Sequence, residues 1–211
     1  SNFVSLATAL TLSRIQAQAS LVEQVVKDHV KYGASSSSRS TLTPAFFVNV
    51  YPFESKLLAV RAFAKKSFRM PTFNDLYYAD MGNSKLNPES ALQYDLGFVL
   101  NKDWKQGIVD HLRLQVDGYY NTVYDKIVAY PKGQQFRWTM LNLGKVHIKG
   151  VDAMAEVGLE PAKDWKVTAR LQYTYQDARD VTDPNTSYYK DQIPYILWHS
   201  GSAILGLSWR E

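Results

Sequence analysis

Apolar and polar residues alternate along most of this chain with a period of two. The pattern is cleanest over 111–121 and recurs over 165–177. Successive side chains of a β-strand point to opposite faces, so this period predicts strands with one apolar and one polar face. In the first segment the apolar parity consists of Leu112, Leu114, Val116, Gly118 and Tyr120.

Further segments alternate in the same way and are rich in β-branched and aromatic residues, which favour strands. The sequence therefore predicts an all-β, antiparallel fold with roughly seven or eight strands in this chain. The predicted strands are 3–12, 41–51, 57–68, 91–100, 111–121, 146–159, 165–177 and 196–209.

Residues 1–40 form an N-terminal part with a mixed pattern. A strand is predicted at 3–12, but over 16–32 the apolar residues Leu21, Val22 and Val25 recur at helical spacing. Local periodicity favours an amphipathic helix there, whereas a barrel would favour strand and loop. The serine run in 34–40 predicts a flexible loop.

The predicted connections alternate between short and long. Short turns fall near 52–56 and 160–164, and long loops fall at about 69–90, 122–145 and 178–195. Outer-membrane barrels have short turns on one side and longer loops on the other, whereas soluble β-sandwiches have shorter strands and turns every 8–12 residues or so. The pattern favours an antiparallel transmembrane β-barrel segment over residues 41–211.

Membrane-spanning helices are not expected. No run reaches the roughly 20 apolar residues that such a helix needs, and barrel strands require only one apolar face. Trp104 and Trp165 lie beside short turns, while Tyr120, Tyr173 and Trp198 lie toward the long loops. Aromatic residues at both ends of the strands are typical of the two interfaces of a bilayer.

Composition narrows the possible partners. The chain has 211 residues and a formal net charge of +4. Because basic and acidic residues are interspersed, the sequence contains no basic block dense enough to indicate nucleic-acid binding. It has no cysteine, which excludes disulfides and thiolate metal sites. The sequence predicts no resident metal or cofactor.

Catalytic motifs are also missing from the sequence. There is no Gly-x-Ser-x-Gly elbow and no phosphate-binding glycine loop. Asp180, Asp183 and Asn185 resemble a loose calcium cluster, but an Asp-Pro-Asn segment more often forms a turn. None of the four histidines has a second histidine at ligand spacing, so we expect no enzyme activity. These histidines are His29, His111, His147 and His199.

The long loops carry the candidate ligand-binding residues, because rigid scaffolds present recognition residues on loops. Aromatic rings and a guanidinium group there could stack on, or pair with, an anionic or ring-bearing ligand. The alternative is that these rings hold the loops at the level of the lipid headgroups. The candidates are Tyr77, Tyr78, Arg137, Trp138, Tyr188 and Tyr189.

The stretch around the first long loop carries a specific motif. It reads Phe68-Arg69-x-Pro71-Thr72-x-x-Asp75-Leu76-Tyr77, then Gly82-Asn83-x-x-Leu86-x-Pro88-Glu89, then Tyr94-x-x-Gly97. This string resembles the barrel signature of TonB-dependent outer-membrane receptors. Arg69, Met70 and Pro71 are expected to fix the path of the chain where the loop begins.

The resemblance implies a fold and a function. In that family a barrel of about 22 strands is closed by an N-terminal plug domain, which contacts TonB and couples uptake to the inner-membrane proton gradient. The ligands are iron chelates such as siderophores, haem, cobalamin or some glycans. The resemblance implies a receptor in the outer membrane of a Gram-negative bacterium, with a small molecule at the extracellular loops and lipid around the barrel.

The chain departs from the family pattern in three respects. It lacks a plug domain, its strands are too few to close such a barrel, and it ends Trp209-Arg210-Glu211 without a terminal aromatic residue. We therefore expect a segment of a larger barrel, with the TonB contact made by a plug domain outside this chain. The alternative interpretation is a soluble β-rich domain that binds a glycan.

Spin labels on neighbouring residues test the predicted sidedness. Single cysteines replacing Leu114 and Gln115 would be labelled in the whole protein in bilayers, where no native cysteine of this chain interferes. The label at 114 should contact lipid and the label at 115 should contact water, because adjacent strand residues face opposite ways. Equal water accessibility at the two positions would contradict the barrel.

Overall fold

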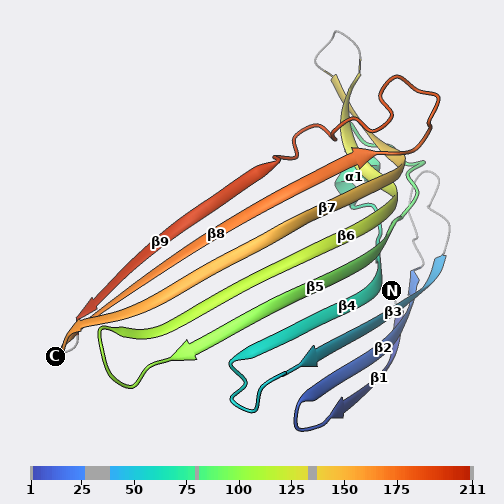
Figure 1. Cartoon of the computed structure of the whole chain (residues 1–211). Coiled ribbons are helices and arrows are strands. Elements are labelled where there is room, and N and C mark those ends of the chain that lie inside the picture. The colour runs from blue at the N-terminus through green and yellow to red at the C-terminus, as the bar shows by residue number, and fades with distance from the viewer. Residues whose placement is uncertain (1, 27–38, 79–80, 133–136, 210–211) are drawn as a thin grey trace.

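A computed structural model shows one antiparallel sheet with nine strands in the order β1 to β9, so every strand pairs with its sequence neighbours (Figure 1). The structure describes residues 2–26, 39–78, 81–132 and 137–209. Within these ranges no helix has the length and apolar character needed to cross a bilayer. The elements are β1 (Asn2–Thr11), β2 (Ile15–Val26), β3 (Arg39–Val50), β4 (Leu58–Arg69), α1 (Phe73–Tyr77), β5 (Glu89–Asp103), β6 (Val109–Lys132), β7 (Arg137–Ala162), β8 (Trp165–Asp180) and β9 (His199–Trp209).

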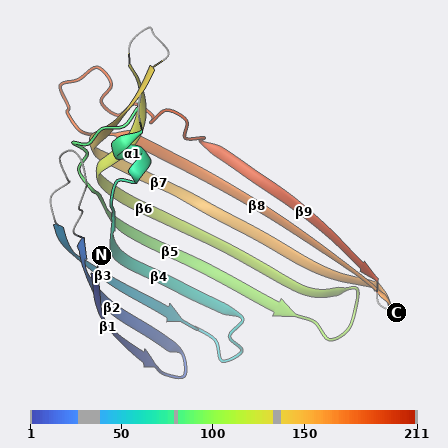
Figure 2. The same cartoon turned by 180° about the vertical axis from the view of Figure 1, so that it is seen from behind.

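Long and short connections lie at opposite ends of the sheet. The β1–β2, β3–β4, β5–β6 and β7–β8 connections are short turns at one end, and residues 70–88 and 181–198 connect strands at the other end (Figures 1 and 2). Helix α1 lies in front of the strand ends in Figure 2, and so on one face of the sheet. We call the two ends the turn end and the loop end.

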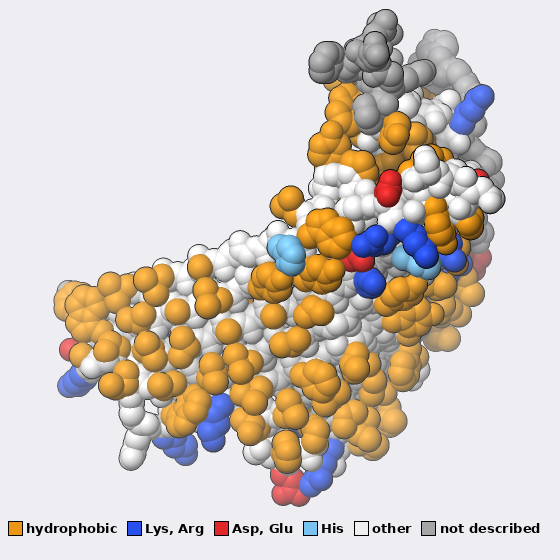
Figure 3. Space-filling view, turned by 45° about the horizontal axis from the view of Figure 1, so that its top comes forward, with side chains coloured by type: hydrophobic (Ala, Val, Ile, Leu, Met, Phe, Trp, Pro, Cys, Tyr) orange, Lys and Arg blue, Asp and Glu red, His pale blue; other side chains and the backbone are white. Residues whose placement is uncertain are grey.

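The two faces of the sheet differ in chemistry. In one row across strands β4 to β8 the residues in register are Ala62, Leu96, Gly118, Val151 and Tyr175. We call the face with this row the apolar face. Its large side chains are exposed, and in Figure 3 they cover the strands while charged groups gather toward the two ends.

The adjacent row has the opposite character and points the other way. It consists of Arg61, Gly97, Asp117, Asp152 and Thr174. We call this side the polar face. An antiparallel ladder in continuous register keeps every parity on one side, so the alternation in the sequence becomes two chemically distinct surfaces.

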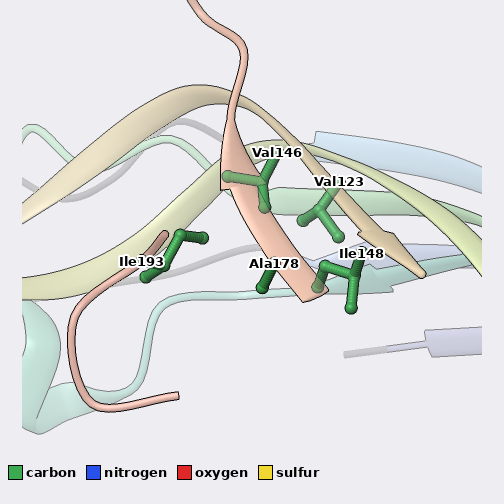
Figure 4. Packing of buried hydrophobic residues seen from close by; sticks show 5 residues of the cluster. All are labelled: Val123, Val146, Ile148, Ala178 and Ile193. Atoms are coloured by element: carbon green, nitrogen blue, oxygen red, sulfur yellow. The ribbon is translucent and has the colours of Figure 1, made fainter. Parts of the chain in front are cut away.

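Buried hydrophobic residues are found where loops fold back onto the polar face at the loop end. Ile193, from the β8–β9 connection, donates its amide to the carbonyl of Ala178 at 2.9 Å and so lies against β8. Ile193 and Ala178 belong to a first buried cluster, shown in Figure 4, which consists of Val123, Val146, Ile148, Ala178 and Ile193. A second cluster joins residues of the β4–β5 connection to β6.

An ion pair crosses β5 on the polar face. The guanidinium of Arg61 on β4 donates Nε to Asp117 Oδ1 at 2.9 Å and Nη2 to Oδ2 at 2.6 Å. Adjacent strands lie about 4.8 Å apart, so a pair that spans two strand gaps must lie flat over the middle strand. Gly97 is that middle residue, and a Cβ there would overlap Asp117 Oδ1. The motif glycine therefore makes room for a bidentate ion pair.

Two other glycines accommodate neighbouring side chains in the same way. Gly158 lies beneath the imidazole of His111, which reaches Glu156 Oε1 at 3.3 Å. Gly150 lies beneath the phenol ring of Tyr119. On this sheet, small residues on one strand let long side chains of the next strand lie flat.

The helix predicted over 16–32 is wrong where the structure describes it. Residues Ile15–Val26 form β2, which pairs along its length with both β1 and β3. Residues 27–32, and most of the predicted serine loop, lie outside the described ranges. The apolar residues Val22, Val25 and Val26 are β-branched, and two ladders of backbone hydrogen bonds outweigh a local helical spacing. This strand raises the count from the expected seven or eight to nine.

The loop predicted over 122–145 is also wrong. Strand β6 continues to Lys132 and β7 starts at Arg137, so the two strands project as a hairpin beyond the rest of the sheet. The register runs from Tyr124 paired with Lys145 to Lys126 paired with Leu143, and Asp125 between them has a φ of 52°. The register is the same on both sides of Asp125, so the alternation continues through it. The sequence pattern does not indicate a strand there because Pro131 and Gly133 favour a turn. The last strand begins at His199 rather than 196.

Substituting Gly97 by alanine should destabilise the whole protein by about 1–3 kcal/mol, because the added methyl group displaces the Asp117 carboxylate from Arg61. Gly118→Ala is the matched control, since the nearest atom to a Cβ there is 3.9 Å away. It should change stability by no more than about 0.5 kcal/mol. Thermal unfolding in detergent measures both, and equal losses would contradict the role of Gly97.

Candidate functional site

Three segments meet at the loop end. The projecting β6–β7 hairpin lies between the β4–β5 connection, which includes α1, and the β8–β9 connection (Figure 2). Five of the six candidate ligand-binding residues have described side chains in these segments. The contacts that fix the segments decide which of those side chains remain free to bind.

Helix α1 starts with a capping box. The Thr72 hydroxyl accepts a hydrogen bond from the Asp75 amide at 3.2 Å, and the Asp75 carboxylate accepts one from the Thr72 amide at 2.9 Å. Both groups satisfy amides that the first turn of a helix leaves unpaired. Thr72 and Asp75 are motif positions, so this part of the motif has a structural role.

The chain turns sharply after α1 and then binds β7. The Gly82 amide donates to the Tyr78 carbonyl at 2.7 Å, and a Cβ on Gly82 would lie 2.6 Å from the Tyr78 nitrogen. Only glycine fits so close to backbone. The Asn83 side chain then donates to the Met140 carbonyl at 3.0 Å, and the Met140 amide donates to the Met81 carbonyl at 2.9 Å. The motif Gly-Asn pair therefore fastens the loop to the hairpin.

Charged motif residues tie the start and the end of the loop together. Arg69, the last residue of β4, lies 3.3 Å from Glu89 and 3.6 Å from Asp75. Glu89 begins β5, and its carboxylate also accepts a hydrogen bond from the Ile127 amide at 3.1 Å and faces Lys126 at 3.8 Å. The carboxylate of Glu89 therefore links β4, β5 and the hairpin.

The apolar motif residues are buried beneath α1. Leu76, Leu86 and Ile127 form a cluster against which Met140 packs. Helical spacing places Leu76 on the side of α1 facing the hairpin, and the aromatic residues on the other side are exposed. Phe73 is 72% exposed and Tyr78 is 59% exposed, and the Phe73 and Tyr77 rings lie 5.5 Å apart. The result is an aromatic surface on a firmly held helix.

The β8–β9 connection is fixed mainly by its own hydrogen bonds and by β8. The Lys190 amide donates to the Asp180 carbonyl at 2.7 Å, and the Gln192 side chain accepts from the Ala178 amide at 3.1 Å. Asp183 accepts hydrogen bonds from the amide and the side chain of Asn185. The Asp-Pro-Asn segment is thus a turn, and across the described residues no group of three or more acidic or histidine side chains could hold a metal ion.

A ring contact joins this connection to the hairpin. Trp138 and Tyr195 have ring centroids 5.8 Å apart, and Tyr195 is 82% exposed. The backbone of Tyr195 has a φ of 66°, a left-handed conformation that turns the chain at that point. Trp138 and Tyr195 form a second aromatic surface, on the hairpin side of the loop end.

The structure places the remaining candidates separately. Tyr188 is exposed, and Tyr189 lies beneath the Lys190 ammonium, which is 5.2 Å from its ring centroid. In the part of the chain that the structure describes, no ring pair connects Tyr188 or Tyr189 to the two aromatic surfaces. Arg137 is the first residue of β7, and its side chain lies outside the described part.

Sequence reasoning missed two aromatic residues of this end. Phe73 could have been found, because its spacing of four from Tyr77 places both rings on one side of a helix turn once the Thr72 cap is noticed. Tyr195 gave no such signal, because its position beside Trp138 depends on the fold of residues far apart in sequence. The two aromatic surfaces could bind a flat or ring-bearing molecule by stacking and by phenol hydrogen bonds.

The three histidines within the described residues each contact a neighbouring side chain. His111 Nδ1 lies 3.1 Å from Asp110 at the turn end, far from the loops. The His147 ring packs on Tyr120 at 5.5 Å, and His199 Nδ1 shares a 2.7 Å hydrogen bond with the Tyr173 hydroxyl. These contacts hold the three side chains on the surface of the sheet.

Comparison with known proteins identifies similar chains. Residues 16–211 match the family described as TonB dependent receptor-like, beta-barrel. The vitamin B12 transporter BtuB of Vibrio vulnificus is 28% identical over 118 residues, which cover 55% of this chain and 17% of the relative. The BtuB of Photobacterium profundum is 28% identical over 130 residues, covering 58% and 19%. The chain thus spans less than a fifth of the length of these curated relatives.

Solved structures share the fold. The copper transporter OprC superposes with a TM-score of 0.63 at 20% identity, over 94% of this chain and 30% of OprC. The FrpB iron transporter from Neisseria meningitidis (F5-1 variant) gives 0.61 at 19% identity, over 96% and 30%. The siderophore receptor PirA from Pseudomonas aeruginosa gives 0.55 at 19%, over 83% and 32%. These likenesses confirm the predicted fold class, a segment of a larger antiparallel barrel.

Removing the cap of α1 should loosen the aromatic surface without disturbing the sheet. Thr72→Ala leaves the Asp75 amide without its acceptor and should cost about 1 kcal/mol of local stability. Hydrogen exchange of residues 73–78 in the whole protein should accelerate about fivefold, while exchange in β5 and β6 stays unchanged. Thr72→Ser keeps the hydroxyl and should exchange like the wild type. Unchanged exchange in Thr72→Ala would show that the cap does not hold the helix.

Proposed function

The chain belongs to the TonB-dependent receptor family, and we propose that the barrel it forms part of is an outer-membrane receptor that binds and imports a scarce, metal-bearing small molecule. The ligand would bind at the loop end and pass through the barrel without being chemically changed. Its relatives are named as transporters and receptors. The single observation that supports binding here is the pair of aromatic surfaces held at one end of the sheet.

The rigid mounting of these aromatic residues supports a binding role. Helix α1 is capped, its loop is bonded to β7, and the β8–β9 connection is bonded to β8. Exposed rings on a flexible loop would lose conformational entropy on binding, whereas rings already held in place lose less. In this proposal Phe73, Tyr77 and Tyr78 form one wall of the binding site, and Trp138 with Tyr195 forms the other.

The proposed orientation follows from the two faces and the two ends. In outer-membrane barrels the longer loops are extracellular, the apolar face contacts lipid and the interior is polar. The loop end would then face the cell exterior, and the polar face would line the lumen. Import would be energised by TonB through a plug domain that is not part of this chain.

Cobalamin is the first ligand to test. Both curated relatives described above are named as vitamin B12 transporters, whereas the structural neighbours are named for copper, iron or a siderophore. A corrin ring presents a broad, flat surface that aromatic side chains can contact. Haem and iron chelates are the next candidates, because they share the combination of a metal and a ring-bearing or chelating frame.

The exposed apolar face disfavours a soluble glycan-binding domain. Leu96, Leu171 and Leu205 are 52%, 60% and 77% exposed, and they belong to one continuous face of the sheet. A soluble protein rarely exposes apolar patches larger than a few hundred Å². Contact with lipid removes that surface from water.

Ligand binding to the whole receptor tests the proposal. Fluorescence or calorimetric titration with cyanocobalamin, haemin and ferric siderophores should identify one class that binds. For that ligand, Tyr78→Ala and Trp138→Ala should each raise Kd about tenfold, because each removes a ring from one wall of the site. Trp104→Ala, at the turn end, is the control and should leave Kd unchanged.

Two results would contradict the proposed function. One is a receptor that binds none of these ligand classes. The other is a ligand whose Kd responds to Trp104→Ala as strongly as to the two loop-end variants, since the site would then lie elsewhere.

A further inference from the structure

The apolar face contains a groove near the loop end. Its volume is about 500 Å³, within the range of about 300–1,000 Å³ that small-molecule sites occupy. Tyr94, Leu96, Gly118, Tyr120 and Val151 line it from the apolar face, and Tyr175 closes it on the β8 side. Residues of the opposite parity, Asp95, Tyr119 and Gly150, also line it, through the strands that form its floor.

A missing side chain creates the hollow. Gly118 stands in register between Leu96 and Val151, and a Cβ there would find its nearest atom 3.9 Å away. The space above Gly118 is therefore open. Tyr94 and Tyr120, in the next row of the apolar face toward the loop end, rise beside it. A smooth lipid-facing surface would need a large residue at this position, so the glycine leaves a channel between rings.

Positive charge borders the groove toward the loop end. Lys149 lines it and is in register with Tyr120, and its ammonium lies 3.6 Å from Asp177. Arg179 contacts the same carboxylate at 2.8 Å, and Lys145 lies over the Tyr124 ring at 5.7 Å. Two cations, Lys149 and Arg179, thus contact one carboxylate. The Lys149 side chain is 63% exposed, whereas that of Asp177 is 4% exposed. Lys149 keeps donors free for another anion.

We propose that this groove binds a membrane lipid that has an acyl chain and an anionic phosphate headgroup. The chain would lie over Gly118 between Tyr94, Tyr120 and Val151, and the phosphate would pair with Lys149 and Arg179. The proposal rests on the proposed membrane orientation, in which the apolar face contacts lipid. It adds a specific lipid site, distinct from the ligand site on the loops.

Three physical arguments support this occupant. Tyrosine rings prefer the interface between hydrocarbon and headgroups, which places the upper part of the groove at headgroup depth. Lysine can extend its apolar stem along such a surface and keep its ammonium among the headgroups. Phosphate oxygens form charge-assisted hydrogen bonds with ammonium and guanidinium groups, so the charge at this end of the groove complements an anionic lipid.

Native mass spectrometry of the delipidated whole receptor, with added dioleoyl phosphatidylglycerol, tests the proposal. The wild type should retain one phosphatidylglycerol in preference to dioleoyl phosphatidylcholine. Gly118→Leu fills the groove, and Lys149→Gln removes the exposed cation. Each should lower phosphatidylglycerol occupancy about fivefold. Lys102→Gln, at the turn end of β5, is the matched charge control and should bind like the wild type.

The outcomes separate this proposal from the proposed function. Unchanged phosphatidylglycerol binding in both Gly118→Leu and Lys149→Gln would overturn the lipid site. Equal retention of phosphatidylcholine, or equal loss in Lys102→Gln, would also overturn it, because the headgroup specificity would be absent. Lys149→Gln changes an exposed residue, so it remains informative if Gly118→Leu does not fold. Binding of the imported ligand should be the same in all three variants, whatever the lipid result.

Discussion

Continuous antiparallel pairing is the constraint on which the rest of this structure depends. Backbone amides and carbonyls inside a sheet are shielded from water, so each strand must satisfy them on its neighbours. The ladder fixes the register, and the register sends alternate side chains to opposite sides. The row with Leu96 and Val151 and the adjacent row with Asp117 and Asp152 are direct results. The sidedness of the sheet and the separation of long from short connections both follow from it.

On the polar face, long side chains can bind one another across closely spaced strands only where a small residue lies beneath them. The ion pair between Arg61 and Asp117 lies over Gly97, and the His111 imidazole lies over Gly158. A sheet without such glycines would have to direct these side chains away from each other and outward from the polar face. Here they lie flat and bind one another. On the apolar face the same residue type has another effect, because nothing covers Gly118 and a groove results.

The sequence predicted the strands that follow a plain period of two, together with the family, from spaced motif residues. The prediction from sequence failed where local spacing or turn-forming residues disagreed with the pairing of the strands. In β2, valines that suit a strand happened to recur at helical spacing, and pairing on both sides decided the outcome. In β6 and β7, Pro131 and Gly133 favour a turn in the sequence, so the pattern indicated a connection, whereas the pairing continues in one register past Asp125. The aromatic candidates of the loop end were found only in part, because the neighbour of Trp138 is Tyr195, a residue of another connection.

The projecting β6–β7 hairpin has a consequence for how binding specificity can change in this family. The β4–β5 connection is bonded to Met140 and Asn142 on one of its arms, and the Tyr195 ring of the β8–β9 connection packs against Trp138 of the same arm. Transplanting either connection from a relative would leave its former contacts behind on the arm, and transplanting the arm would leave those of both connections behind. The smallest portion that can be exchanged as a module is therefore the arm together with both connections. New specificities would be acquired by replacing that block in one event, or by slow coordinated drift of all three parts.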